Sequence, residues 1–227
     1  MLQADNKRPN VILVLVDDMG FSDLGLTGSE IRTPNIDSIA RNGVLLSAMY
    51  NCARCCPTRA ALLTGLYPHN AGIGHMGAYL GSPAYQGFLR NDSATIAEAL
   101  RLAGYRTLMS GKWHVGGDYT ARLVDSWRVG DLEHPTPRQR GFDRFYGVLE
   151  GWTNLHHPHR LVRDNSPVDV DSYPDGYYFT DDITDEAIAY LKSLRAHDAE
   201  RPFFLYLAHG AVHGPLQAKP EDIERHR

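Results

Sequence analysis

The fold is decided by Asn10-Val11-Ile12-Leu13-Val14-Leu15-Val16-Asp17-Asp18, close to the start of the 227-residue chain. Residues 10–16 are continuously apolar from Val11 onward and rich in Val, Ile and Leu, which predicts a central parallel strand buried on both faces. Two acidic residues follow this strand directly. The stretch therefore indicates a parallel sheet with polar chemistry at a strand end.

Further along the chain, the order of strand, polar loop and helix recurs. Additional strands are expected at 44–50, 105–109 and 203–208, and helices at 34–41, 57–63, 94–103 and about 180–195. This order predicts an α/β fold with a mainly parallel sheet and helices on both faces. The Gly-, Pro-, His- and Asp-rich residues 115–174 predict long loops with short elements.

Helix boundaries are indicated by capping residues and glycines. Thr33 before Pro34 is typical of a helix start, as is Ser93 before the third helix. Gly43, Gly65 and Gly104 are expected to end the first three helices, and Thr180 or Asp181 to cap the last. The charged tail 219–227 carries no terminating element.

The composition is that of a globular protein, with 43% hydrophobic and 22% charged residues. It excludes a disordered chain, a collagen and a coiled coil. The formal net charge of −4 argues against a nucleic-acid binder. The longest apolar run, 11–16, is far shorter than the roughly 20 residues that span a bilayer. The polar residues 1–9 leave open a cytoplasmic protein, or a periplasmic or secreted one whose signal has been removed.

Polar side chains follow three of the predicted strands. Because ligands bind beyond the carboxyl ends of parallel strands, these side chains are expected to converge in space. They are Asp17 and Asp18, Lys112 and His114, and His209 and His213.

The adjacent carboxylates of Asp17 and Asp18 repel each other, so their joint presence requires a cation or a shared proton. Carboxylate oxygens suit Ca²⁺ or Mg²⁺. Capping of a turn by Asp is the alternative interpretation.

The three cysteines are Cys52, Cys55 and Cys56, so no distant pair can form a disulfide across the fold. Cys55 stands at the entrance of a predicted helix with Arg59 one turn later, and the helix N-terminus and the guanidinium both stabilise an anion. A structural zinc site with Cys52-x-x-Cys55 spacing is the alternative, although a matching second ligand pair is missing. Buried thiols that act as small hydrophobic side chains are another.

Residues 55–65, Cys-Cys-Pro-Thr-Arg-Ala-Ala-Leu-Leu-Thr-Gly, resemble the signature of the sulfatase family, Cys-x-Pro-Ser/Thr-Arg followed by a helix that ends in Thr-Gly. Four other blocks resemble family blocks in the same order along nearly the whole chain. They are 9–18, 104–114, 141–143 and 211–216. The resemblance places the chain in the N-terminal portion of an arylsulfatase-like enzyme of the alkaline phosphatase superfamily.

The resemblance implies that Cys55 is converted to Cα-formylglycine by a maturation enzyme. One hydroxyl of the hydrated aldehyde would attack the sulfur of a sulfate ester and expel the alcohol. The second hydroxyl would then lose its proton and reform the aldehyde, which releases sulfate.

The resemblance also assigns roles to the other residues. Asp17, Asp18 and residue 55 would hold Ca²⁺, with Mg²⁺ as the alternative, and Arg59 would orient the aldehyde hydrate. Lys112 and His213 would bind the sulfate oxygens, and His114 would take the proton of the second hydroxyl.

Two histidine groups are left without such a role. His209 falls outside the matched position, so an ordinary loop residue is the favoured interpretation. His156, His157 and His159 are interpreted as the rim of the substrate pocket, with a solvent-exposed loop or a metal site as the alternatives.

Family partners from later in the chain, a second metal-binding pair and a second sulfate-binding lysine, are not found after His213. Residues 1–227 are therefore expected to be the N-terminal part of a catalytic domain whose C-terminal portion is absent. The predicted function is hydrolysis of an aryl or small-molecule sulfate ester. The alternatives are a phosphonate monoester or phosphodiester hydrolase of the same superfamily, and an inactive chain that only binds anions or partners.

Overall fold

A computed structural model describes residues 8–117 and 130–226. Its sheet has six strands in the order β1-β6-β2-β3-β4-β5. The first four, β1 (Val11–Leu15), β6 (Phe203–Ala208), β2 (Arg106–Lys112) and β3 (Arg144–Val148), are parallel, and β4 (Val162–Arg163) and β5 (Ser166–Pro167) are added antiparallel. The predicted α/β class with a mainly parallel sheet is confirmed.

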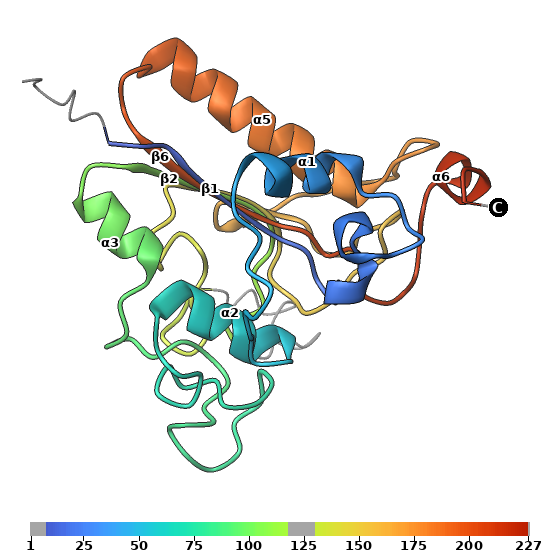
Figure 1. Cartoon of the computed structure of the whole chain (residues 1–227). Coiled ribbons are helices and arrows are strands. Elements are labelled where there is room, and N and C mark those ends of the chain that lie inside the picture. The colour runs from blue at the N-terminus through green and yellow to red at the C-terminus, as the bar shows by residue number, and fades with distance from the viewer. Residues whose placement is uncertain (1–7, 118–129, 227) are drawn as a thin grey trace, which may run out of the picture.

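Helices lie on both faces of this sheet (Figure 1). The long helix α5 (Phe179–His197) lies on one face, and α2 (Cys55–Thr64) and α3 (Ile96–Leu102) lie on the other. Because side chains alternate along a strand, β6 contributes to two cores. Phe203 and Leu205 pack with α5, whereas Phe204 and Tyr206 pack with α2 and α3. No helix in the described ranges is long and apolar enough to cross a membrane.

The strand that decides the fold lies at the edge of the sheet. β1 pairs with β6 on one side only within the described residues. Val11, Leu13 and Leu15 pack against the core, but Ile12 and Val14 are 53% and 51% exposed. The prediction of a strand buried on both faces was therefore wrong for this chain. A continuous apolar run shows only that both faces of a strand can be buried, and the described residues leave the side chains of Ile12 and Val14 about half exposed.

Several local predictions are corrected by the structure. Residues 44–50 form no strand and are exposed. The third helix is capped by Thr95, whose side chain accepts a hydrogen bond from the Glu98 backbone in a capping box, and not by Ser93. The last long helix has Tyr178 at its N-cap position instead of Thr180 or Asp181. The short helix α6 (Pro220–Glu224) lies in the tail, whereas β3 is one of the short elements expected within residues 115–174.

The first two helices match their predictions closely. α1 (Pro34–Asn42) follows Thr33, whose hydroxyl donates to Asp37 at 2.7 Å and does not cap the helix. α2 ends at Gly65, which has φ +70°. It begins at Cys55, two residues before the predicted start. That shift places the thiol on the first turn of the helix.

Gly111, directly before Lys112, is a position where only glycine fits. Its φ is +112°, and a Cβ atom there would lie 2.0 Å from the backbone oxygen of Ala208 in the neighbouring strand. Gly111→Ala is expected to lower the free energy of unfolding by about 3 kcal/mol or more, because both strands must separate. Urea denaturation measures this loss. Gly28→Ala is the control, since Gly28 has φ +100° with open space around it and should cost only about 1 kcal/mol. Equal losses in the two variants would contradict the steric explanation.

Candidate active site

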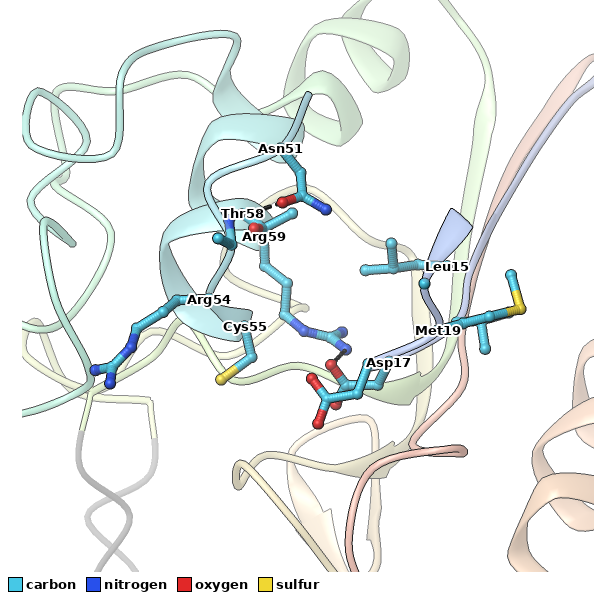
Figure 2. Close-up of a pocket in the computed structure, with 12 residues that line it drawn as sticks. Leu15, Asp17, Met19, Asn51, Arg54, Cys55, Thr58 and Arg59 are labelled. Atoms are coloured by element: carbon cyan, nitrogen blue, oxygen red, sulfur yellow. Dashed lines mark hydrogen bonds and ion pairs between the residues drawn. The ribbon is translucent and has the colours of Figure 1, made fainter. Parts of the chain in front are cut away.

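A cavity of about 220 Å³ lies at the carboxyl end of β1 and faces the start of α2 (Figure 2). Both acidic residues of the first strand and the first cysteine of α2 line it. Arg59 extends from α2 toward Asp17, Cys55 stands at the start of the same helix, and Arg54 points away. The complete lining is Leu15, Val16, Asp17, Asp18, Met19, Gly20, Asn51, Ala53, Arg54, Cys55, Thr58 and Arg59.

Asp17 is buried between two cations. Its Oδ2 accepts a short hydrogen bond from the Lys112 ammonium, and its Oδ1 lies 3.5 Å from the Arg59 Nη2. Lys112 is 1% exposed and Arg59 is fully buried. Burial has the largest effect and lowers the pKa of Lys112, and repulsion from Arg59 lowers it further. The Asp17 carboxylate opposes this shift. The carboxylate therefore compensates two charges that have left water.

Arg59 connects the helix to two strands. Its Nη1 donates to the Lys112 carbonyl at 2.8 Å and to the Tyr206 hydroxyl at 3.3 Å. Its Nε and Nη2 are buried and have no hydrogen-bond partner among the described residues. Because Nη2 faces the Asp17 carboxylate at 3.5 Å, Nε is the donor that remains open to a further anionic oxygen. Sequence reasoning missed Tyr206, and a tyrosine inside an otherwise apolar strand was the available signal.

Asp18 differs from its neighbour in almost every respect. Its backbone has φ +62° and its side chain is 60% exposed. The His213 imidazole lies beside it, with Nε2 3.8 Å from Oδ2. The left-handed backbone turns the two successive carboxylates in different directions, so one is buried and the other faces the opening.

Cys55 lies against Cys56 and His114. The two Sγ atoms and a ring nitrogen of His114 all lie within 4.8 Å of one another. The interaction with Cys56 lowers the pKa of Cys55 most strongly, burial raises it, and His114 and Lys112 lower it further. Cys56 is held protonated, because its own pKa is raised by Cys55 and by burial. Cys55 is therefore the reactive thiol of the pair.

Because its pKa is lowered, Cys55 is expected to remain a thiolate, and to be alkylated rapidly, well into the acid range. Iodoacetamide labelling of the unconverted protein followed by peptide mass spectrometry should give a rate at residue 55 that changes little between pH 8 and pH 5. A free thiol in the same tube should slow about tenfold per pH unit below its pKa of about 8.5. Cys56→Ala removes the main cause of the lowered pKa, so alkylation of Cys55 in this variant should slow at acid pH. A wild-type rate that falls like the free thiol would contradict the assignment.

The structure brings most of the predicted site residues together. Asp17, Lys112 and Arg59 contact one another directly, Cys55 lies against His114, and Asp18 lies near His213. Lys112, His114 and His213 are not among the residues that line the 220 Å³ cavity. Asn51 and Thr58 also line the cavity and were not predicted as site residues, although Thr58 is the Ser/Thr position of the signature, whereas Asn51 in its loop gives no signal of its own.

The remaining histidines lie elsewhere. His209 has a buried Nδ1 without a hydrogen-bond partner among the described residues, and burial lowers its pKa. His156 contacts the Tyr177 carbonyl and His159 contacts Glu150. None of the clustered histidines joins a metal-ligand group in the described part of the chain, and Cys52 does not join Cys55 in one.

The donor chemistry of the cavity fits a hard divalent cation. Asp17 and Asp18 offer carboxylate oxygens to the same cavity that Cys55 lines, and oxygen is the ligand that Ca²⁺ and Mg²⁺ prefer. The described residues supply part of a Ca²⁺ shell, since that ion takes six to eight oxygens.

Known proteins resemble this chain in sequence and in fold. The Sulfatase family profile matches residues 9–227. The arylsulfatase of Klebsiella aerogenes is 34% identical over 237 residues, covering 98% of this chain and 47% of that protein. The crystal structure of Ps i-CgsB in complex with k-i-k-neocarrahexaose is 33% identical with a TM-score of 0.77, covering 96% of this chain and 48% of that one.

A phosphonate monoester hydrolase of Agrobacterium radiobacter shares the fold, with a TM-score of 0.61 and 22% identity over 96% of this chain and 44% of that one. This chain thus spans less than half the length of each of these three relatives. Because the family profile covers almost every residue and the arylsulfatase aligns along nearly the whole chain, this chain belongs to the sulfatase family.

Proposed function

We propose that the protein hydrolyses an aryl or small-molecule sulfate ester through a formylglycine made from Cys55. The observation that carries the proposal is the shared cavity. Cys55, on the first turn of α2, lines the same 220 Å³ space as Asp17 and Asp18. A nucleophile made at residue 55 would therefore act beside carboxylates that suit a cation. A hydrated aldehyde there would supply one hydroxyl for attack on sulfur and a second for release of sulfate.

A divalent cation held by Asp17, Asp18 and residue 55, Ca²⁺ or alternatively Mg²⁺, would supply Lewis-acid chemistry when bound. The cationic side chains of Arg59 and Lys112 would provide the remaining electrostatic stabilisation. Arg59 lines the cavity, its buried Nε has no hydrogen-bond partner among the described residues, and it would orient the hydrate. Lys112 is fixed by Asp17, so its charge is positioned before any substrate arrives.

Two imidazoles complete the proposed roles. His114 contacts Cys55, and burial, its largest influence, lowers the pKa of the ring. A neutral imidazole can accept the proton of the second hydroxyl. His213 lies on the exposed side, near Asp18, where it would bind a sulfate oxygen of the incoming ester.

We further propose that residues 1–227 form the N-terminal part of a longer catalytic domain. The support is the share of the relatives that this chain covers, 47% of the arylsulfatase and 48% of Ps i-CgsB. The partially exposed β1 face and the incomplete oxygen shell are consistent with this view. Activity is therefore expected from the full-length protein after conversion by a formylglycine-generating maturation enzyme.

Mass spectrometry of the tryptic peptide that contains residue 55 tests the proposal. In a host that carries the maturation enzyme, an aldehyde is expected at residue 55 and a thiol at Cys56. An unmodified thiol at residue 55 in that host would count against the mechanism.

The substrate class is tested by parallel hydrolysis of an aryl sulfate and an aryl phosphonate monoester by the full-length converted protein. Faster turnover of the sulfate is expected. The shared fold of the phosphonate monoester hydrolase makes the opposite preference the main alternative. Failure to turn over either ester would favour a chain that only binds anions or partners.

A further inference from the structure

We propose that the unconverted protein has a soft-metal site made of Cys55, Cys56 and His114, which binds Zn²⁺ or Cd²⁺. The site is distinct in chemistry from the oxygen-lined cavity next to it, since it offers two sulfurs and a nitrogen. It exists only while residue 55 is a cysteine. The inference does not depend on sulfatase activity.

The geometry of the three donors carries this inference. Both Sγ atoms and one His114 ring nitrogen lie within 4.8 Å of one another, although His114 is 58 residues away from Cys56 in the sequence. Donors bound to one tetrahedral Zn²⁺ lie about 3.5–4 Å apart, given Zn–S of about 2.3 Å and Zn–N of about 2.0 Å. Small side-chain rotations therefore bring the group to the geometry of a metal site.

The supporting structure holds these donors in place. Cys56 is 1% exposed on α2, and His114 follows the buried strand β2. The His114 backbone N–H donates to the Leu149 carbonyl at 3.1 Å, and its ring packs against Gly151, where a Cβ atom would lie 2.4 Å from Nε2. The ring is thus confined, and less ordering is needed when an ion binds.

An orphaned polar atom is the second, independent observation. The His114 Nδ1 is buried and has no hydrogen-bond partner among the described residues. Buried polar groups almost always have a partner, so one without any indicates that a ligand or ion can satisfy the ring. Thiolates with an imidazole select zinc-like ions over Ca²⁺ or Mg²⁺.

The charges of the site allow a divalent ion but limit its affinity. The ion replaces any protons on the two thiols, which leave to solvent, and no atom is oxidised or reduced. Two thiolates neutralise one divalent ion. Lys112 and Arg59 lie nearby and repel it, with Asp17 compensating only part of their charge. We therefore expect a Kd of about 1 µM, weaker than that of four-ligand structural zinc sites.

The test is a Cd²⁺ titration of the full-length protein made in a host without the maturation enzyme, with a thiol at residue 55 verified by mass. Thiolate-to-cadmium charge-transfer absorption should saturate at one ion per site. Cys55→Ser, Cys56→Ser and His114→Ala should each weaken binding about 100-fold or abolish it. Cys52→Ser is the matched control, since Cys52 lies outside the group, and should bind like wild type.

Two further measurements distinguish this site from the oxygen-lined cavity next to it. Asp18→Asn should leave the Cd²⁺ titration curve unchanged, because the Asp18 carboxylate is not one of the three donors. Saturating Cd²⁺ should slow alkylation of Cys55 at least tenfold. Overturning results are the absence of a saturable signal in the wild type, or binding by Cys56→Ser that equals wild type. These measurements use the unconverted protein. A failure to hydrolyse a sulfate ester would therefore not affect them, and a failure to bind Cd²⁺ would not affect the proposed hydrolysis.

Discussion

Asp17→Asn is expected to lower the free energy of unfolding by about 3 kcal/mol, because it leaves two buried cations without a counter-charge. The Lys112 ammonium and the Arg59 guanidinium both contact this carboxylate and are almost completely buried. Urea denaturation of the full-length protein measures the loss. Turnover of an aryl sulfate by the converted protein should be abolished in the same variant.

Asp18→Asn is the matched control. Asp18 is 60% exposed, so its loss should change the free energy of unfolding by no more than about 0.5 kcal/mol. Turnover should still fall strongly, since the proposed cation site needs both carboxylates. Equal stability losses in the two variants would contradict the distinction between a buried structural charge and an exposed one.

The pH dependence of the Asp17→Asn defect follows from Lys112. Burial lowers the pKa of Lys112 in the folded protein, so the unfolded chain binds more protons between that lowered pKa and about 10.4. Stability therefore rises with pH across this window, as the folded protein loses the buried charge. The difference between variant and wild type should narrow toward alkaline pH, and a difference that widens there would contradict the charge explanation.

Cys55→Ala is expected to lower the turnover of an aryl sulfate by the full-length converted protein by at least about 10³-fold. Alanine can be neither a nucleophile nor a precursor of one, and removal of a nucleophile has effects of this size or larger. Steady-state rates with an aryl sulfate give the measurement. The loss should appear in kcat/KM without a comparable change in thermal stability, because the Cys55 side chain is only half-buried.

Cys56→Ala provides the comparison for Cys55→Ala, because the two thiols are neighbours on α2. Cys56 is buried in the core, so its variant should lose stability of about 1 kcal/mol and keep turnover within about tenfold. A Cys56→Ala protein as inactive as Cys55→Ala would show that the wrong cysteine has been assigned.

The sequence by itself determined the α/β class, the helix ends at Gly43 and Gly65, and the polar residues at the strand ends. Each follows from a local cause: continuous apolar runs, residues with fixed backbone preferences, and motif spacing. The resemblance to the sulfatase family also indicated Cys55, Arg59, Lys112 and His114, since the Cys-x-Pro-Thr-Arg block and its companions occur in order along the chain.

Only the tertiary structure decided how these residues divide their tasks. The sequence shows Asp17 and Asp18 as an equivalent pair, yet the left-handed backbone at Asp18 leaves one carboxylate buried between two cations and turns the other toward solvent. The tertiary structure also places β1 at an edge of the sheet, and it brings Cys56 close to His114, which lies 58 residues later in the sequence. The physical reason is that burial and ionic contact depend on which segments meet in space, and local sequence patterns carry no information about the partner that will cover a given face.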